Sequence, residues 1–197
     1  MTPPPMKKFY FSLALIWIFL GLNAAQGTTV IPPTFDELVD KAEVIFQGTV
    51  TDVRAQWVGE GAQHRIMSYV TFKVEDTMKG APGDTYTLRM LGGTVDGETM
   101  EVSDGPKFEV GGREIVFVEN NGSQFIPLVG IMHGRFHIQK DDQTGAEFVT
   151  TNEHQPVKDV SKLGRAETAA ATGRGLSSTE FKSAIRSTLQ TQRELAR

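Results

Sequence analysis

The residues of this chain that could perform acid–base or metal chemistry are four histidines and 24 carboxylates, and there is no cysteine. His133 and His137 are four residues apart in a segment that we expect to be a strand, which would place both imidazoles on one side. Two imidazoles could begin a metal site. The sequence shows no evident third ligand, and Gly134 between them indicates a break in the strand. We therefore favour two ordinary surface or edge histidines and expect no metal and no cofactor.

No motif typical of a known catalytic centre occurs in the chain. A nucleophile elbow, a P-loop, a dinucleotide fingerprint and a His-Glu-x-x-His motif are all absent. Without cysteine, disulfides, thiolate metal sites and cysteine nucleophiles are excluded. Carboxylates from distant parts of a chain can meet in a fold, so a hydrolase with a carboxylate pair is an open alternative. We name no catalytic residue and favour binding over catalysis.

The first 27 residues have the pattern of a secretion signal. Lys7 and Lys8 form a positive start, residues 9–22 are almost entirely apolar, and Ala25-Gln-Gly27 offers small residues for a signal peptidase. The apolar run is shorter than the ~20 residues of a membrane-spanning helix. We expect a signal peptide at 1–27, with cleavage after Gly27 or alternatively after Ala25. The product would be secreted or periplasmic, without a stable membrane anchor.

The charge of the mature chain is negative and uneven. The full sequence has 20 basic and 24 acidic residues, so 18 basic residues remain without Lys7 and Lys8, and the net charge is −6. Residues 28–159 carry a net −10, whereas residues 160–197 carry a net +4. Nucleic-acid binding depends on Lys and Arg contacts to phosphates, so the acidic part argues against such a partner.

Hydrophobic periodicity predicts a mainly β chain with a helix at each end. Thr34 and Glu37 have the spacing of a capping box before a short helix at 35–42, and Ser177 and Glu180 repeat it before an amphipathic helix that reaches about residue 196. Between the helices we expect strands at 44–53, 66–74, 85–91, 114–119 and 125–132, then a hairpin of 136–139 with 147–150. Gly48 marks a bend in the first strand.

This pattern suggests a small five-stranded OB-like β-barrel at residues 28–159. A long first strand with a glycine bend favours a barrel, because such a strand can pair on both sides. Residues 160–176 are rich in Ala, Gly and Thr and are interpreted as a linker to the helix at 177–197. Alternatively, the apolar stripe of Phe181, Ile185 and Leu189 packs on the barrel.

Four segments, taken in order, resemble the netrin-like domain of the tissue inhibitors of metalloproteinases. They are residues 28–33 (TTVIPP), 41–50 (KAEVIFQGTV), 69–80 (YVTFKVEDTMKG) and 111–118 (GGREIVFV). The resemblance covers about residues 28–119, and its order and spacing carry most of its weight. The fold that it implies is an OB-type five-stranded barrel, which agrees with the strand pattern.

The resemblance also implies a binding site at the mature N-terminus. In that family, the free amino group and carbonyl of the first mature residue chelate the zinc of a metalloproteinase, and the second residue enters its specificity pocket. These positions correspond to Thr28 and Thr29. The family has cysteines at its first and third mature positions, where this chain has Thr28 and Val30.

We therefore expect an exported, non-catalytic binding module for a protein or extracellular ligand, with a zinc metalloproteinase as the partner that the resemblance suggests. The alternatives are a secreted hydrolase with a carboxylate pair in the barrel mouth, and a structural module of an extracellular assembly.

Overall fold

The computed structural model describes residues 31–103, 105–142, 144–165 and 174–197. Within these ranges the chain is mainly β, with two α-helices, α2 (Phe35–Lys41) and α3 (Ser178–Leu195). Both helices begin with the predicted capping box, formed by Thr34 with Glu37 and by Ser177 with Glu180.

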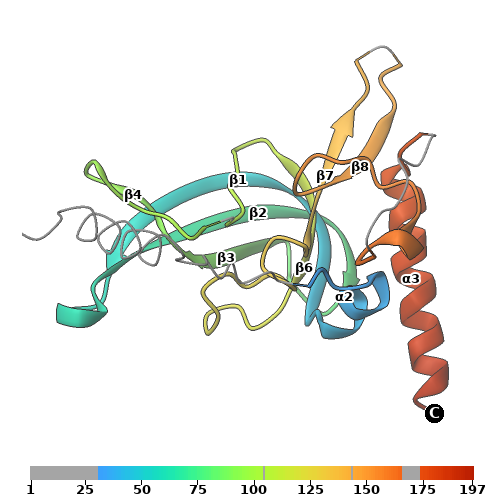
Figure 1. The fold of residues 1–197 in the computed structure, drawn as a ribbon, viewed down its shortest axis with the longest axis horizontal. Helices are drawn as coiled ribbons and strands as arrows, with labels where there is room; N and C mark the ends of the chain where they lie inside the picture. The colour runs from blue at the N-terminus through green and yellow to red at the C-terminus, as the bar shows by residue number, and fades with distance from the viewer. Residues whose placement is uncertain (1–30, 104, 143, 166–173) are drawn as a thin grey trace, which may run out of the picture. The chain divides into compact units, whose positions relative to one another are not determined.

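Six strands form one antiparallel sheet in the order β3-β2-β1-β6-β7-β8 (Figure 1). Their bounds are β1 Val44–Val58, β2 Arg65–Lys79, β3 Thr85–Leu91, β6 Arg113–Val118, β7 Arg135–Lys140 and β8 Glu147–Thr151. A separate hairpin consists of β4 (Gly93–Val95) and β5 (Glu98–Met100), and two 3-10 turns, η1 and η2, lie at Gly61–Gln63 and Val160–Lys162. The sheet is open, since β3 and β8 form its edges and are not paired with each other. The closed five-stranded barrel is therefore not confirmed.

Strand β1 pairs on both sides, as a bent first strand was expected to do. Residues 44–49 pair with β6, while nearly the whole strand pairs with β2. A Cβ atom at Gly48 would lie 2.7 Å from the carbonyl oxygen of Lys73, and the register with β2 shifts beside this glycine. The absent side chain lets the two backbones approach at the bend. Beyond it, the β1–β2 hairpin extends away from α3 (Figure 1).

Both edges of the sheet are covered by other parts of the chain. Along β3, the side-chain oxygen of Asn121 accepts from the amide of Arg89, and its nitrogen donates to the carbonyl of Thr87. Along β8, the amide of Val149 donates to the carbonyl of Leu176. These bonds satisfy backbone groups that an open edge would expose.

Residues 125–132, predicted as a strand, form a loop, and that prediction is wrong. Gly130 and Ile131 have φ angles of +63° and +65°, which turn the chain instead of extending it. Leu128 and Val129 enter the apolar layers on opposite faces of the sheet. This alternation explains the strand-like pattern of the segment.

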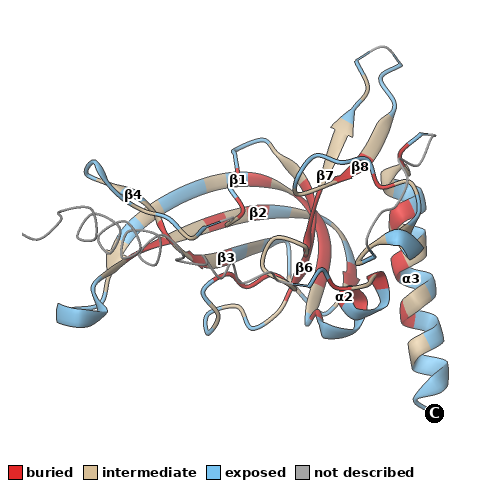
Figure 2. Cartoon of the chain, viewed as in Figure 1, coloured by how far each residue is buried: buried red, intermediate tan, exposed pale blue. Residues whose placement is uncertain are grey.

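The sheet separates two apolar layers. Buried residues lie along the strands of the sheet and on the side of α3 that faces it (Figure 2). The helices cover one face, where Phe181, Ile185 and Leu189 of α3 are buried among side chains of β6, β7 and β8. The predicted apolar stripe of the C-terminal helix thus packs on the sheet. On the opposite face, Val70 and Phe72 of β2 are buried. That second face is covered by loops and carries the candidate functional site.

Candidate functional site

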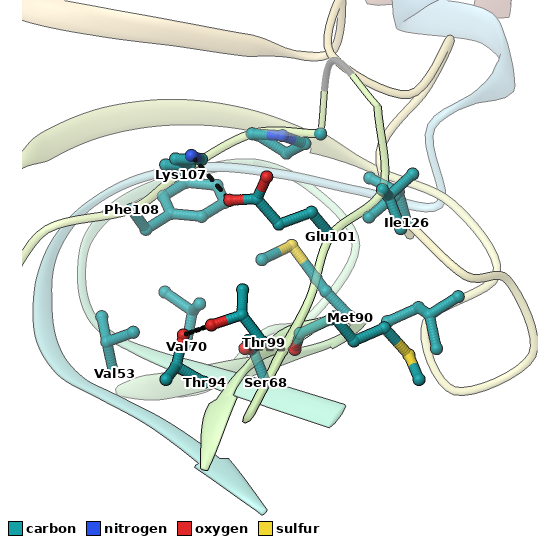
Figure 3. Close-up of a pocket in the computed structure, with 17 residues that line it drawn as sticks. Val53, Ser68, Val70, Met90, Thr94, Thr99, Glu101, Lys107, Phe108 and Ile126 are labelled. Atoms are coloured by element: carbon teal, nitrogen blue, oxygen red, sulfur yellow. Dashed lines mark hydrogen bonds and ion pairs between the residues drawn. The ribbon is translucent and has the colours of Figure 1, made fainter. Parts of the chain in front are cut away.

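An open cavity of about 290 Å³ lies on the loop-covered face of the sheet, beneath the chain segment that contains β4 and β5 (Figure 3). We call it the sheet cavity, and we call residues 92–109 the covering segment. The sheet cavity is lined by Val53, Ser68, Val70, Met90, Leu91, Gly92, Gly93, Thr94, Thr99, Met100, Glu101, Val102, Gly105, Pro106, Lys107, Phe108 and Ile126.

The covering segment starts close to the sheet because it begins with two glycines. Gly92 and Gly93 have φ angles of +101° and +132°, which side chains disfavour. A Cβ at Gly93 would lie 2.5 Å from the Ser68 hydroxyl and 2.7 Å from the Ala55 methyl. The Ser68 hydroxyl also donates to the carbonyl of Gly92 at 2.7 Å. The chain therefore leaves β3 and crosses back over β1 and β2.

A tight hairpin then shapes one wall of the sheet cavity. Strands β4 and β5 are joined by Asp96-Gly97, both with positive φ angles, as a two-residue hairpin turn requires. The hydroxyls of Thr94 and Thr99 are hydrogen bonded at 2.9 Å across the hairpin, and both line the sheet cavity. Figure 3 shows them beside Val53 and Val70 of the sheet.

The opposite side of the sheet cavity consists of an aromatic side chain, Phe108, which forms its floor, and an ion pair at its rim. Phe108 is buried and packs edge-on against Phe72 at 5.5 Å between ring centroids. Near it, the Lys107 ammonium lies 3.1 Å from a carboxylate oxygen of Glu101, with both side chains mostly exposed (Figure 3). The walls are thus largely apolar, with charges at the rim, which is the usual composition of a binding site.

Behind Phe108, three ionisable side chains form a cluster within the sheet. Glu114 of β6 accepts from Arg135 of β7 at 2.9 Å, and its second oxygen lies 3.1 Å from Nδ1 of His137. Glu114 and Arg135 are both almost completely buried. Strand register explains the contact between Glu114 and His137, because these two residues are direct partners in the pairing of β6 with β7. A buried pair of this kind fixes the position of both partners.

On the helix-covered side, two other carboxylates share one guanidinium. Arg113 of β6 contacts both Glu75 of β2 and Glu147 of β8. Burial acts to raise the pKa of Glu75, but hydrogen bonds from Thr49, Gln47 and Arg113 hold that pKa below its ordinary value. The pKa of Glu75 is therefore lowered, whereas a carboxyl group that acts as a general acid needs a raised pKa.

The histidines do not assemble as a metal centre. His133 lies in the loop before β7, not on a strand, and burial lowers its pKa. His137 instead stacks on His154, with ring centroids 4.3 Å apart. Among the residues that the structure describes, no group of three or more potential ligands could hold a metal ion. Thr28 and Thr29, predicted as binding residues, lie outside the described residues.

Sequence reasoning missed the sheet cavity, since it interpreted the Asp-Gly pairs of the covering segment only as turns. The signal that could have found it is Gly92-Gly93 directly after a strand, which allows the chain to turn back across the sheet.

Comparison with protein families, curated proteins and solved structures gives no match to this chain. In the part of the chain that the structure describes, no helix is long and apolar enough to cross a membrane.

Proposed function

We propose that the mature chain is an exported, non-catalytic binding module that holds its ligand in the sheet cavity. The observation that carries this proposal is the cavity itself, with apolar walls, a charged rim and an open mouth. Its wall includes an exposed apolar side chain, since Val53 lines the cavity and is 39% exposed. An exposed apolar side chain in a concavity is typical of interaction sites.

The charges of the site support binding over hydrolysis. Among the described residues that line the sheet cavity, Glu101 is the one carboxylate, and it is paired with Lys107. A glycosidase-type mechanism needs two carboxyl groups, of which one has a raised pKa. The structural-module alternative is also less favoured, since α3 buries its apolar stripe against the sheet of its own chain.

The proposal is tested by filling the cavity. Thr99 is exposed on β5 and lines the cavity, so Thr99→Trp should occlude the space without disturbing the apolar layers. Thr87→Trp is the matched control, because Thr87 is also exposed on a strand and does not line the cavity. The immobilised wild-type domain and both variants are incubated with the extracellular fraction of the native culture. We expect one ligand to be retained by the wild type and T87W and lost from T99W. Equal retention by all three would overturn the proposal.

A second candidate, inhibition of a zinc metalloproteinase, is favoured by the packing of Pro33. Pro33 is buried, and Cβ atoms at Gly130 and Gly164 would come within 3.0 Å and 2.6 Å of it. This packing fixes the chain at Pro33. A proline-stiffened lead-in lowers the cost of ordering the residues before it on binding. We infer that Thr28 and Thr29 could then act as in the netrin-like family that the sequence resembles.

This second candidate is tested at the N-terminus itself. One form of the domain starts at Thr28 and the other carries one additional alanine before it. Both are assayed against a panel of zinc metalloproteinases. Inhibition by the first form alone supports chelation by the α-amino group, whose ordinary pKa of about 8 leaves a usable neutral fraction. Equal inhibition by both forms, or none by either, removes this candidate.

A further inference from the structure

We propose that the ligand of the sheet cavity is a cationic peptide segment of a partner protein, with one large apolar side chain inserted in the cavity and basic residues on either side of it. This inference rests on the proposed function and names the class of ligand. It depends on three features: the size of the cavity, the chemistry of its walls and the charge of its cover.

The size favours a side chain over a whole small molecule. At about 290 Å³, the cavity is just below the ~300–1,000 Å³ of pockets that enclose drug-sized ligands. It is also open, so that a small molecule would keep part of its surface in water. A pocket for one anchoring side chain at the centre of a larger contact is the usual arrangement of a protein interface.

The walls suit an aliphatic or aromatic anchor. Met90, Met100 and Phe108 contribute unbranched thioether and aromatic surface. Methionine adapts its shape to the group that it contacts, and it also packs well against aromatic rings. The partly exposed Val53 extends this apolar surface to the solvent, where the backbone of a bound segment would lie.

The covering segment is acidic, and most of its charge is not neutralised. Its described residues include four acids, Asp96, Glu98, Glu101 and Glu109, all exposed, against the single cation Lys107. Glu101 pairs with Lys107, whereas no ion-pair partner is found for the other three acids within the part of the chain that the structure describes. Asp96 lies in the hairpin turn and Glu98 directly follows the turn, close in sequence to the lining residues Thr94 and Thr99. Complementary charge at a rim speeds association and selects the partner.

The test selects peptides from a random 12-residue phage library against the mature domain, with T99W as the counter-selecting protein. We expect the enriched peptides to carry Lys or Arg within two residues of Leu, Met or Phe. The Kd of a synthetic peptide selected in this way is then measured for the double variant Asp96→Asn with Glu98→Gln, which removes two acids that have no ion-pair partner among the described residues. We expect it to be weakened about 3- to 10-fold at low salt, as for two exposed ion pairs, and less at high salt.

The control is Glu153→Gln with Glu194→Gln, which removes the same charge from two exposed acids outside the covering segment. Its Kd should change less than about 2-fold. Enriched peptides that need an open cavity but lack basic residues would overturn the inference and leave the proposed function standing. The same holds if no peptide is enriched while the dye 8-anilinonaphthalene-1-sulfonate binds the wild type and not T99W. If neither peptides nor dye distinguish T99W from the wild type, the proposed function fails as well.

Discussion

The guanidinium carbon of Arg135 lies 4.1 Å from the centre of the Phe108 ring, so the buried ion cluster of the sheet rests directly against the floor of the sheet cavity. A cation over an aromatic face is attracted to it. The same guanidinium is held by Glu114. The position of the cavity floor is thus coupled to the strength of an ion pair that lies outside the cavity.

Removing the buried cation should destabilise the fold strongly. In Arg135→Met, Glu114 remains buried without its guanidinium, and we expect a loss of about 3–5 kcal/mol in the free energy of unfolding. Urea denaturation measures it. Adding Glu114→Gln to this variant should restore a good part of the loss. Arg54→Met, which removes a mostly exposed partner of Asp52, should cost less than about 1 kcal/mol. Similar losses for both arginine variants would contradict this.

Phe72 should be a major contributor to the apolar layer beneath the cavity. It is completely buried and packs edge-on against both Phe46 and Phe108. Phe72→Ala should therefore cost about 3–5 kcal/mol, through lost burial and the space left behind. The control, Lys73→Ala, changes an exposed neighbour on the same strand. A cost below about 1 kcal/mol for Phe72→Ala would mean that this face of β2 is not packed as described.

The C-terminal helix should contribute to the stability of the whole domain. The ring of Phe181 contacts those of Phe35, Phe117 and Phe136, with the nearest centroid at 4.8 Å. We expect Phe181→Ala to cost about 3–5 kcal/mol in urea denaturation. Leu195 on the same helix is 83% exposed, and Leu195→Ala should be nearly neutral. If Phe181→Ala were also neutral, the helix would behave as an appendage.

Acid should weaken the attachment of this helix. Burial acts to raise the pKa of Asp76, but hydrogen bonds from Lys182 and Arg186 of α3 hold that pKa below its ordinary 3.8. The folded state then binds fewer protons than the unfolded state, so the contribution is complete above pH 3.8 and is lost as the pH falls through the folded pKa.

The melting temperature at pH 6 and pH 3 measures this effect. The decrease should be larger for the wild type than for Asp76→Asn, which has no charge to lose at this position. Asp84→Asn, at an exposed position in the turn before β3, should keep the wild-type decrease. An equal decrease in all three proteins would show that Asp76 does not contribute.

Export predicts a defined N-terminus. If residues 1–27 are a signal peptide cleaved after Gly27, N-terminal sequencing of the exported protein should read Thr-Thr-Val-Ile. Cleavage after Ala25 would instead give Gln-Gly-Thr-Thr. Finding Lys7 and Lys8 intact in a membrane fraction would count against the signal peptide.

Local patterns predicted most of the elements but not their arrangement. The two capping boxes located both helices, and the strand at 85–91 has the predicted bounds, because these signals act within a few residues. The loop at 125–132 was mistaken for a strand. Hydrophobic periodicity indicates which face of the sheet a side chain contacts, but it does not indicate whether the backbone is paired with another strand.

The sheet cavity could not be predicted because its residues meet only through tertiary contacts. Val53, Met90 and Phe108 come from parts of the chain that single-sequence periodicity cannot bring together. The same applies to the Arg135–Phe108 contact, which joins a strand to a loop. The contact between Glu114 and His137 depends on strand register, which local sequence patterns do not specify.

The hydrogen bond from Val149 to Leu176 makes the solubility of the protein depend on its C-terminal segment. Proteolytic clipping before residue 174 would remove both α3 and the carbonyl that accepts from the Val149 amide. Residues 155–157 would still bond part of the β8 edge, but the apolar layer under α3 would lie uncovered. A large exposed apolar surface promotes association with other molecules. A clipped chain would therefore not simply melt at a lower temperature, but would also associate through this uncovered layer.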